Sequence, residues 1–457
     1  MKKFSCKPKP IEKAITLGNT GNDHDGGYIE LGRLAESGAI IPVHLSTDKP
    51  LVAAIVGKRG SGKSYTLGSI VESLCTKNNT SSLGQRKVGQ AQLLFDTLGI
   101  FQWMGTQVTS NSPSETIRLQ ALAHRGWALK NEELNTEVYV PKGNRAEWTP
   151  TTHKDFALSE SLMSLEDWSY LLGLDITSER MGQLLSDSFI KVTQDGWYDG
   201  SKTYKPTGEN VLNIISSCIN SDTEILSLYA PETRRALSQQ LLAISRLGIF
   251  NQGGTNLTQL LVNNQLSILV MNKLADSIRL AILTALIRAI MKSRIEASEF
   301  TKQRLISAET NNKSSHPEIP IVPPCWVEID EAQNILPSER KTSATDSLVR
   351  LVREGRNYGI SFVVTTQQPS SIDQRIMAQV DLLIVHKLSV QSDIEYVAKN
   401  LKSILPDEVS FGGRILSFPE VIRSLDTGQA LVSHVDSDRA YLVDIRPRVS
   451  VHGGFSI

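Results

Sequence analysis

The sequence predicts an α/β protein whose strands form a mainly parallel sheet. Short, unbroken apolar runs recur along the chain, which is typical of strands that are buried on both faces of such a sheet. One of these runs leads directly into a glycine-rich loop, and a helical pattern follows that loop. Carboxylate or amide residues end several other runs, at the edge where parallel sheets bind their ligands.

The segment at residues 51–66 is the one around which the other motifs are arranged. Residues 51–56 form an apolar run, and the pattern G-x-x-x-x-G-K-S begins directly after it. Backbone N–H groups that turn inward onto phosphate oxygens need glycines there, because side chains would block the ligand. Lys63 can reach the β- and γ-phosphates, the Ser64 hydroxyl can bind Mg²⁺, and the helix that begins near Ser64 directs its positive dipole end at the anion. We therefore predict an ATP-binding loop that consists of Gly57, Lys58, Arg59, Gly60, Ser61, Gly62, Lys63, Ser64 and Tyr65.

Length and composition narrow the possible function classes. At 457 residues the chain is long enough for one large domain with insertions or for about two to three domains. The formal net charge of zero excludes a chain that is basic over its whole surface, so a nucleic-acid contact needs a local basic patch or several subunits. The four cysteines show no C-x-x-C spacing, and charged residues interrupt the apolar stretch 274–291. We therefore expect a reduced, cytoplasmic protein without a structural zinc site or a membrane span.

The first part of the chain leads from a small β region into the nucleotide-binding core. Residues 1–48 are expected to form a short N-terminal β arm, because two stretches in it alternate apolar and polar residues as half-buried strands do. Residues 49–97 supply the first part of the core, and its second buried strand, 91–96, ends at Asp96. Asp96 either faces the edge that carries the phosphate-binding loop or caps the next turn, and the sequence leaves both alternatives open.

Residues 98–261 are predicted to be a mainly helical insertion. Apolar residues recur at intervals of three and four in four segments, which are 158–172, 178–192, 210–217 and 232–247. Residues 138–141 are a candidate for one further short strand. The aromatic residues Trp168, Trp197 and Tyr198 are expected in the core of this insertion rather than in a base-stacking platform.

Residues 262–446 return to the parallel-sheet pattern and complete the core. A strand at 266–272 is followed by a long helix over 274–291 and by a segment, 302–320, that we expect to be a mobile loop. The next apolar strand ends in Asp330 and Glu331. Because successive side chains point in different directions, Asp330 can hold the Mg²⁺ shell through water while Glu331 orients or deprotonates the attacking water.

The remaining core elements follow in sequence. An arginine-rich helix over 346–358 stops at a glycine and leads into a buried strand that ends at Gln367. Gln367 either senses the γ-phosphate or belongs to a polar cluster that merely ends the strand. Further strands are expected at 381–388, 428–433 and 441–445, and the C-terminal tail at 447–457 is expected to be irregular and too polar for the core.

With these motifs the sequence resembles the HerA branch of the HerA/FtsK superfamily of hexameric P-loop ATPases. The pieces that carry the resemblance are residues 57–66, Asp-Thr-Leu-Gly at 96–99, residues 327–333, Arg-Glu-Gly-Arg-Asn-Tyr-Gly at 353–359 and Thr-Thr-Gln-Gln-Pro-Ser at 365–370. The resemblance implies a RecA-like P-loop NTPase core with a helical insertion, assembled as a homohexameric ring that binds ATP and Mg²⁺ at its subunit boundaries. It also implies that Lys63 and Ser64 bind phosphate and Mg²⁺, Asp330 supports the metal, Glu331 activates water and Gln367 acts as a sensor.

The resemblance further implies an arginine finger that reaches the neighbouring subunit. Arg356, or else Arg353, would fill this role, where a correctly placed arginine is worth ~10³ to 10⁵ in rate. A surface ion pair is the alternative for both arginines.

Two functions follow from the resemblance. The first is a motor that translocates double-stranded DNA and feeds a partner nuclease, with basic residues such as Lys142, Arg145, Lys341 and Arg375 along its pore. The second is a nucleotide-controlled scaffold that activates a separate effector enzyme without translocation. Family members usually carry a full N-terminal β-barrel before the phosphate-binding loop, whereas only about 48 residues are available for it here. HerA-like ATPases also pair with effector enzymes in bacterial antiphage defence, so this setting is expected as well, and a conjugation-type ATPase is a further alternative.

Overall fold

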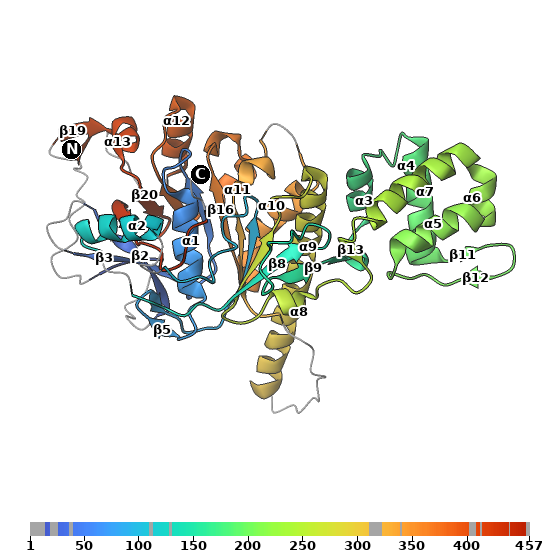
Figure 1. Cartoon of the computed structure of the whole chain (residues 1–457), viewed down its shortest axis with the longest axis horizontal. Coiled ribbons are helices and arrows are strands. Elements are labelled where there is room, and N and C mark those ends of the chain that lie inside the picture. Colours follow the sequence, from blue (N-terminus) through green and yellow to red (C-terminus); the bar gives the residue numbers. More distant parts are fainter. Residues whose placement is uncertain are drawn as a thin grey trace.

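One long sheet runs through the main body, with helices on both of its faces and a group of helices to one side (Figure 1). The computed structural model describes residues 14–18, 26–35, 40–108, 113–127, 130–309, 322–338, 341–401, 408–411, 414–437 and 439–453. Within these residues the sheet has 15 strands, in the order β1-β3-β2-β21-β20-β17-β4-β16-β15-β7-β14-β8-β9, with β5 and β6 attached beside β2.

The centre of the sheet is parallel, as predicted. Its strands, in spatial order, are β17 (Leu382–Val385), β4 (Val52–Val56), β16 (Ile360–Thr366), β15 (Cys325–Ile329), β7 (Ala91–Asp96), β14 (Leu266–Val270), β8 (Thr136–Pro141) and β9 (Lys154–Phe156). Each neighbouring pair in this series runs parallel, so all carboxyl ends lie along one edge. The fold class expected from the apolar runs is therefore confirmed.

The other half of the sheet is mostly antiparallel and contains the N-terminal strands. It comprises β20 (Gln429–His434), β21 (Ala440–Ile445), β2 (Tyr28–Leu34), β3 (Pro42–Ser46), β1 (Ile15–Leu17), β5 (Thr80–Ser81) and β6 (Gly84–Gln85). Strand β2 pairs antiparallel with β21, so the N-terminal strands continue the main sheet.

Alternate residues of the central strands enter two separate cores. In β4, Ala53 and Ile55 pack with α1 (Lys63–Leu74) on one face. Val52, Ala54 and Val56 pack on the other face, where α9 (Asp276–Glu309) and α10 (Thr345–Glu354) lie. Smaller elements complete the body, which are α2 (Pro113–His124), α11 (Gln374–Met377), α12 (Gln391–Asn400), α13 (Phe418–Ser424) and the hairpin of β18 (Glu408–Phe411) and β19 (Arg414–Ser417).

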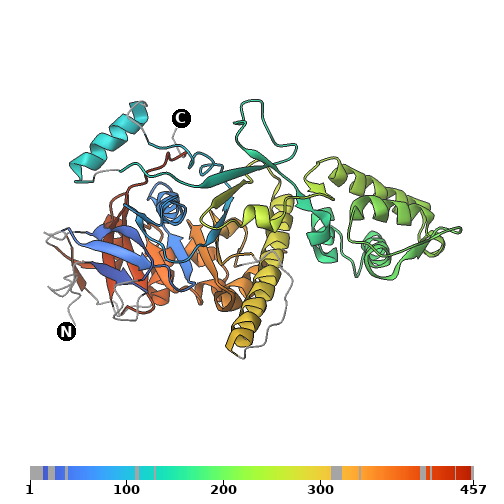
Figure 2. The same cartoon turned by 90° about the horizontal axis from the view of Figure 1, so that it is seen from below.

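A helical lobe stands to one side of the sheet (Figures 1 and 2). It contains α3 (Leu165–Leu172), α4 (Arg180–Ile190), α5 (Val211–Ser221), α6 (Thr223–Leu228), α7 (Pro231–Ser245) and the hairpin of β11 (Trp197–Tyr198) and β12 (Thr203–Tyr204). The pair β10 (Leu158–Ser159) and β13 (Phe250–Asn251), with α8 (Leu257–Leu260), connects it to the body. The buried Asp167 carboxylate caps α3 and accepts a hydrogen bond from Arg288 Nη1 of α9 at 2.9 Å. This ion pair fixes the lobe to the body.

Several expectations about individual segments were wrong. Residues 158–164 contain β10 and a short 3₁₀ turn rather than helix, and Tyr198 is 44% exposed whereas Trp168 and Trp197 are buried as predicted. Residues 302–309 belong to the long helix α9, not to a loop, and residues 310–320 lie outside the described residues. The helix α2 had no counterpart in the predicted pattern.

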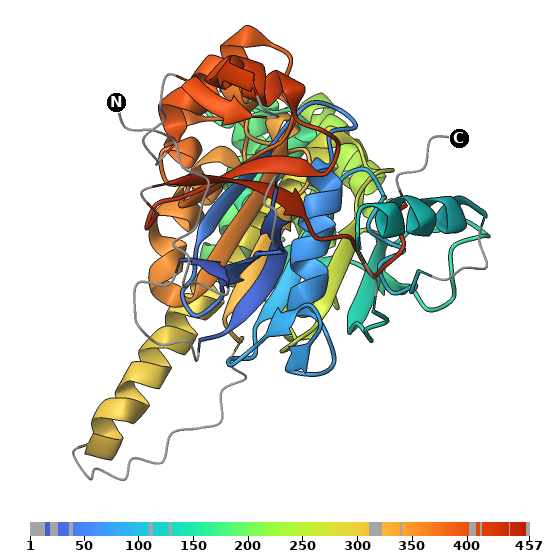
Figure 3. The ribbon, with the colours of Figure 1, turned by 90° about the vertical axis from the view of Figure 1, so that its left-hand side faces the viewer.

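The C-terminal segment is also not the external tail that its polarity suggested. Residues 446–453, here termed the C-terminal strap, cross helix α1 (Figure 3). The side chains of Arg446, Arg448 and Ser450 are all buried, at 4%, 0% and 1% exposure. Their polarity is compatible with burial because Glu72 of α1 is buried against them.

No helix in the described part of the chain combines the length and apolar character that crossing a lipid bilayer requires.

Candidate nucleotide-hydrolysis site

The glycine-rich loop joins β4 to α1 and holds Lys63 in a buried position. Lys63 is 4% exposed, and its Nζ donates a hydrogen bond to the carbonyl oxygen of Lys58 at 3.1 Å. Gly62 caps the helix with φ at 114°, which favours glycine, whereas Gly57 is required for space. A Cβ atom at Gly57 would lie only 2.6 Å from Ser61 Oγ. The loop therefore has the shape of a phosphate cradle, with the Lys58 carbonyl in the place of an anionic partner.

His386 lies beside this loop, and its role there was not predicted from the sequence. It follows the neighbouring strand β17, and its Nε2 lies 2.8 Å from Thr66 Oγ1 while its Nδ1 lies 2.8 Å from the carbonyl oxygen of Gln429. Burial lowers the pKa of His386 to about 4, so the ring is neutral at physiological pH. A neutral ring donates from Nδ1 to the carbonyl and accepts from the Thr66 hydroxyl at Nε2. His386 thus connects Thr66, near the start of α1, to Gln429, the first residue of β20.

Asp330 lies at the end of β15, two strands from β4, and reaches the same loop. Its Oδ1 accepts hydrogen bonds from Ser64 Oγ at 3.3 Å and from Thr365 Oγ1 at 2.5 Å. Its Oδ2 is buried and has no hydrogen-bond partner. Burial above all, with the nearby charges of Glu331 and Asp96, raises the pKa of Asp330 to about 7, although the hydrogen bonds from Thr365 and Ser64 oppose the shift. A cation at this position would relieve both the unpaired oxygen and the cost of burying the charge.

The residues at this position fit Mg²⁺. A carboxylate oxygen without a partner and a serine hydroxyl are hard oxygen ligands, which Mg²⁺ prefers. Among the described residues there is no cluster of three or more His, Cys, Asp or Glu that could hold a metal alone. Nucleotide-bound Mg²⁺ needs no such cluster, because phosphates and water supply most of its ligands.

Glu331 is held in a strained and well-oriented position beside Asp330. Its backbone φ is 54°, a left-handed conformation that is uncommon for a non-glycine residue. Gln367 Nε2 donates to Oε1 at 2.7 Å, and Gln333 Nε2 donates to Oε2 at 2.6 Å. The backbone N–H of Glu331 donates to Thr365 Oγ1 at 3.0 Å. The carboxylate is therefore fixed at the edge of the sheet by partners from its own turn and from β16.

The charges of this site act on one another. Burial lowers the pKa of Lys63, and the charges of Glu331 and Asp330 oppose that shift. The structure thus brings together Lys63, Ser64, Asp330, Glu331 and Gln367, which the sequence placed at the ends of separate strands.

Asp96 fulfils both alternatives that the sequence left open. Its carboxylate caps the next turn, with hydrogen bonds from the backbone N–H groups of Gly99 at 2.8 Å, Ile100 at 3.1 Å and Phe101 at 2.8 Å. It also lies close enough to Asp330 to raise the pKa of that group. Its role within the chain is thus to shape the turn beside the site.

The two arginines of the predicted finger do not reach the site of their own chain. Arg356 Nη1 lies 2.6 Å from Oδ1 of Asp381, whose Oδ2 accepts a hydrogen bond from the N–H of Val52. Val52 begins β4, whereas the phosphate-binding loop follows the end of that strand, so Arg356 lies at the opposite edge of the sheet. The five residues of β4 separate Arg356 from the loop by about 17 Å. Arg353 is exposed, with its side chain in solvent.

Three residues of the site were not predicted individually, namely Thr365, Gln333 and His386. Thr365 and Gln333 lie inside the quoted motifs, and a polar residue one or two positions from a strand end was the available signal. His386 lies inside the predicted strand 381–388 and directly follows the observed β17, but only the pairing of β17 with β4 places it beside the loop.

Comparisons with known proteins show the family to which the chain belongs. The chain matches the family described as "Helicase HerA, central domain" over residues 29–290, more than half of its length. The DNA double-strand break repair helicase HerA of Sulfurisphaera tokodaii is 28% identical over 130 residues, which cover 28% of this chain and 24% of that protein. The protein of the same name from Sulfolobus acidocaldarius is 30% identical over 112 residues, or 24% of this chain and 20% of that protein. The chain therefore matches a quarter or less of the length of these two relatives.

Among solved structures, VirB4 of Thermoanaerobacter pseudethanolicus resembles the chain over most of its length. The TM-score is 0.50 at 13% sequence identity, and the similarity covers 93% of this chain and 98% of that one. This likeness concerns the fold alone. The family match shows that the chain, a HerA-like P-loop protein, belongs to the family of the HerA helicase central domain.

Proposed function

We propose that the protein hydrolyses ATP as a homohexameric ring, and that the ring translocates double-stranded DNA together with a partner nuclease or another effector enzyme. The observation that carries this proposal is the convergence of Lys63, Ser64, Asp330, Glu331 and Gln367 at the carboxyl edge of the sheet. This set supplies a phosphate-binding cation, metal ligands and a carboxylate for the attacking water. The settings we propose are DNA end processing or antiphage defence.

Each residue has a distinct task in the proposed reaction. Lys63 exchanges the Lys58 carbonyl for the β- and γ-phosphate oxygens, and Ser64 with Asp330 would hold Mg²⁺. When bound, Mg²⁺ neutralises negative charge on the phosphate oxygens. Glu331 orients the attacking water and accepts its proton, while Gln367 keeps the carboxylate in position.

The position of Arg356 supports a site that is completed by a neighbouring subunit. Because Arg356 lies at the edge opposite its own phosphate-binding loop, it is available to a neighbour rather than to its own ATP. The ion pair with Asp381 keeps the guanidinium at that edge and only 38% exposed. In this proposal Arg356, rather than the exposed Arg353, is the arginine finger.

The proposal includes a division of the chain into regions. Residues 49–97 and 262–446 form the ATPase core, residues 98–261 the mainly helical insertion, residues 1–48 the N-terminal arm and residues 447–457 the C-terminal tail. The helical lobe of the insertion stands clear of the sheet edge, where it is available to an effector (Figure 1).

The experiment that tests the motor is ATP hydrolysis measured with and without duplex DNA over a series of salt concentrations. We expect DNA to stimulate hydrolysis, and we expect the stimulation to weaken as salt rises, because phosphate contacts release counterions. Lys63→Ala should remove hydrolysis under all conditions. Hydrolysis that is indifferent to DNA at every salt concentration would contradict the motor.

One observation favours the second function, a nucleotide-controlled scaffold that activates an effector without translocation. Three of the four basic residues expected along a pore are already paired with acidic groups, namely Arg145 with Asp155, Arg375 with Asp373 and Lys341 with Asp346. Because acidic partners neutralise part of their charge, we expect these three residues to attract DNA less strongly than the sequence suggested. For a scaffold, we expect co-purification with an effector in fixed stoichiometry and loss of the effector's activity in Lys63→Ala. A ring that is fully active on DNA alone would contradict the scaffold.

A further inference from the structure

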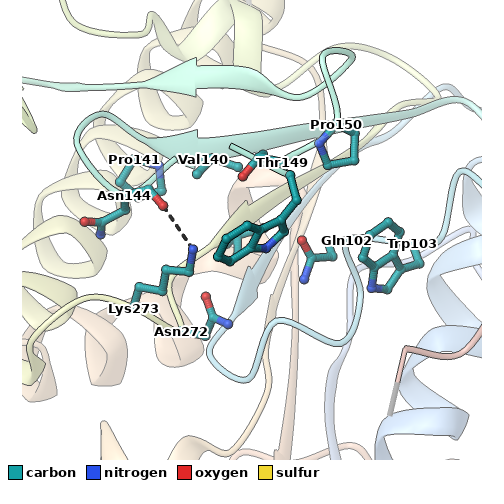
Figure 4. A pocket seen from close by; sticks show the side chains of 11 residues that line it. Gln102, Trp103, Val140, Pro141, Asn144, Thr149, Pro150, Asn272 and Lys273 are labelled. Carbon is teal, nitrogen blue, oxygen red and sulfur yellow. Dashed lines mark hydrogen bonds between the residues drawn. The ribbon is translucent and has the colours of Figure 1, made fainter. Parts of the chain in front are cut away.

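A hollow lies on the same edge of the sheet as the nucleotide-hydrolysis site, but farther along it. It is formed where β14 and β8 end and where the turn after β7 passes, and we term it the tryptophan pocket (Figure 4). The residues that matter here are Gln102, Trp103, Asn144, Trp148, Asn272 and Lys273. Four strand spacings separate β4 from β14, so the pocket lies about 20 Å from the phosphate-binding loop. At that distance it is not the binding site for the base of the hydrolysed ATP.

The tryptophan pocket leaves aromatic surface exposed to solvent, most of it on Trp148. Trp148 is 83% exposed and Trp103 is 40% exposed, whereas Trp168, Trp197 and Trp326 are buried in the cores. An indole left in water forgoes the stabilisation that its burial would give. The Trp148 ring nevertheless lies near another residue of the pocket. The Lys273 ammonium group is 5.8 Å from the centroid of this ring.

The polar groups around the indoles are amides and one cation. Lys273 Nζ donates to the carbonyl oxygen of Asn144 at 3.3 Å, a contact that ties the loop carrying Trp148 to the end of β14. Gln102 and Asn272 present carboxamides, and Gln102 Nε2 also donates a hydrogen bond to the carbonyl oxygen of Gly99 at 2.6 Å. No Asp or Glu lines the hollow. Indole faces, carboxamides and a single ammonium group together suit a planar, hydrogen-bonding ligand that carries a phosphate.

We propose that the tryptophan pocket binds an unstacked nucleobase of single-stranded DNA and that Lys273 contacts the adjacent phosphate. This inference rests on the proposed action of the protein on DNA. The pocket volume of about 190 Å³ is below the ~300–1,000 Å³ of pockets that enclose a whole drug-sized ligand, so it suits one ring system with the backbone outside. In an intact duplex both faces of each base are stacked, so an indole reaches a base face only in a single strand or at an open end. The pocket therefore recognises the single-stranded part of the DNA that the protein handles.

The test is a titration of the full-length protein with labelled oligo(dT), dTMP and a blunt duplex, followed by anisotropy and by intrinsic tryptophan fluorescence. We expect oligo(dT) to quench the fluorescence of the wild type. Trp148→Ala should weaken oligo(dT) binding by about tenfold or more, and Trp148→Phe should retain most of it, because a base stacks on either aromatic face. Lys273→Gln should weaken binding and reduce its salt dependence. Tyr198→Ala, which removes an aromatic residue that is 44% exposed on the helical lobe, is the control and should change nothing.

The outcomes separate this inference from the proposed function. If duplex DNA stimulates ATP hydrolysis while oligo(dT) binds Trp148→Ala as well as the wild type, the pocket inference is overturned and the motor stands. If dTMP binds as tightly as oligo(dT), the pocket recognises a free nucleotide and the single-strand assignment is wrong. If Trp148→Ala leaves DNA binding unchanged but lowers the mass of the assembly, the pocket is a protein contact. If the wild type binds neither DNA form, both proposals fail.

Discussion

Asp330 is the residue in which stability and ligand binding oppose each other most clearly. It is fully buried, one of its oxygens has no partner, and its pKa is raised to about 7. In the ligand-free protein it therefore keeps a proton over a pH range in which the unfolded chain has lost it. The contribution of Asp330 to the free energy of unfolding is therefore fully present at low pH and is lost as the pH rises toward 7. The buried Glu328 and Asp96, whose pKa values burial also raises, act with the same sign.

We predict that Asp330→Asn stabilises the ligand-free protein at pH 8 by a few kcal/mol, since one pKa unit corresponds to about 1.4 kcal/mol. Asparagine keeps an acceptor oxygen for Ser64 and Thr365 but carries no charge. Urea unfolding of both proteins at pH 5 and pH 8 measures the effect, and the difference should shrink at pH 5. A difference that is the same at both pH values would show that Asp330 is not the titrating group.

The sequence was most informative about residues that share one short motif. Lys63 and Ser64 follow from the loop pattern, and Asp330 and Glu331 follow from a strand end. His386 and Gln333 could not be assigned in this way, because their roles depend on which strands are neighbours and on how Glu331 turns. The positive φ of Glu331 lets two amides reach its carboxylate, and local patterns do not reveal such a strained residue.

At the scale of elements, the C-terminal strap and helix α1 depend on one buried carboxylate. Glu72 accepts hydrogen bonds from Arg446 Nη1 at 2.8 Å, from the N–H of Val449 at 3.0 Å and from Ser450 Oγ at 2.7 Å. Arg448 crosses the helix where Gly68 leaves room, since a Cβ atom there would lie 2.7 Å from the guanidinium. The strap thereby holds the helix that begins at the phosphate-binding loop.

We predict that Glu72→Ala destabilises the protein by about 3–5 kcal/mol, because it leaves a buried guanidinium without its carboxylate. Glu354→Ala is the matched control, since its exposed ion pair with Arg350 should contribute less than about 1 kcal/mol. The midpoints of urea unfolding compare the two variants. Equal midpoints would mean that the strap contributes little to the fold.

The helices and strands were predicted correctly where the apolar runs were long. The predictions were wrong where polar residues belong to ordered segments. Strands β4, β7, β14, β15 and β16 all coincide with predicted runs. The strap was assigned to the surface because composition cannot reveal that Glu72 neutralises its arginines. The outer turns of α9 were assigned to a loop because their polar residues lie on a helix that extends beyond the body (Figure 3).

At the scale of the whole molecule, the sheet separates the phosphate-binding loop from Arg356. The two lie at opposite edges, so one chain cannot use both for the same ATP molecule. A ring in which each subunit presents Arg356 to the next resolves this separation.

We predict that Arg356→Ala retains ATP binding but loses hydrolysis by roughly 10³-fold or more, while Arg353→Ala remains active. Co-expression of Arg356→Ala with Lys63→Ala should restore part of the activity, because an intact loop then lies beside an intact arginine. The steady-state ATPase rate of the mixed assembly measures this. The absence of any recovery in mixed assemblies would argue against a shared site.

The most direct measurement of the central claim is ATP hydrolysis by Glu331→Gln at saturating ATP, compared with the wild type and with Glu354→Gln as an exposed control. Glutamine preserves the size of the side chain but cannot accept the proton of the attacking water. We expect ATP binding to be retained and the hydrolysis rate to fall by about 10²- to 10⁴-fold, with the control unchanged. A Glu331→Gln variant that hydrolyses ATP at the rate of the wild type would contradict the assignment of this sheet edge as the hydrolytic centre.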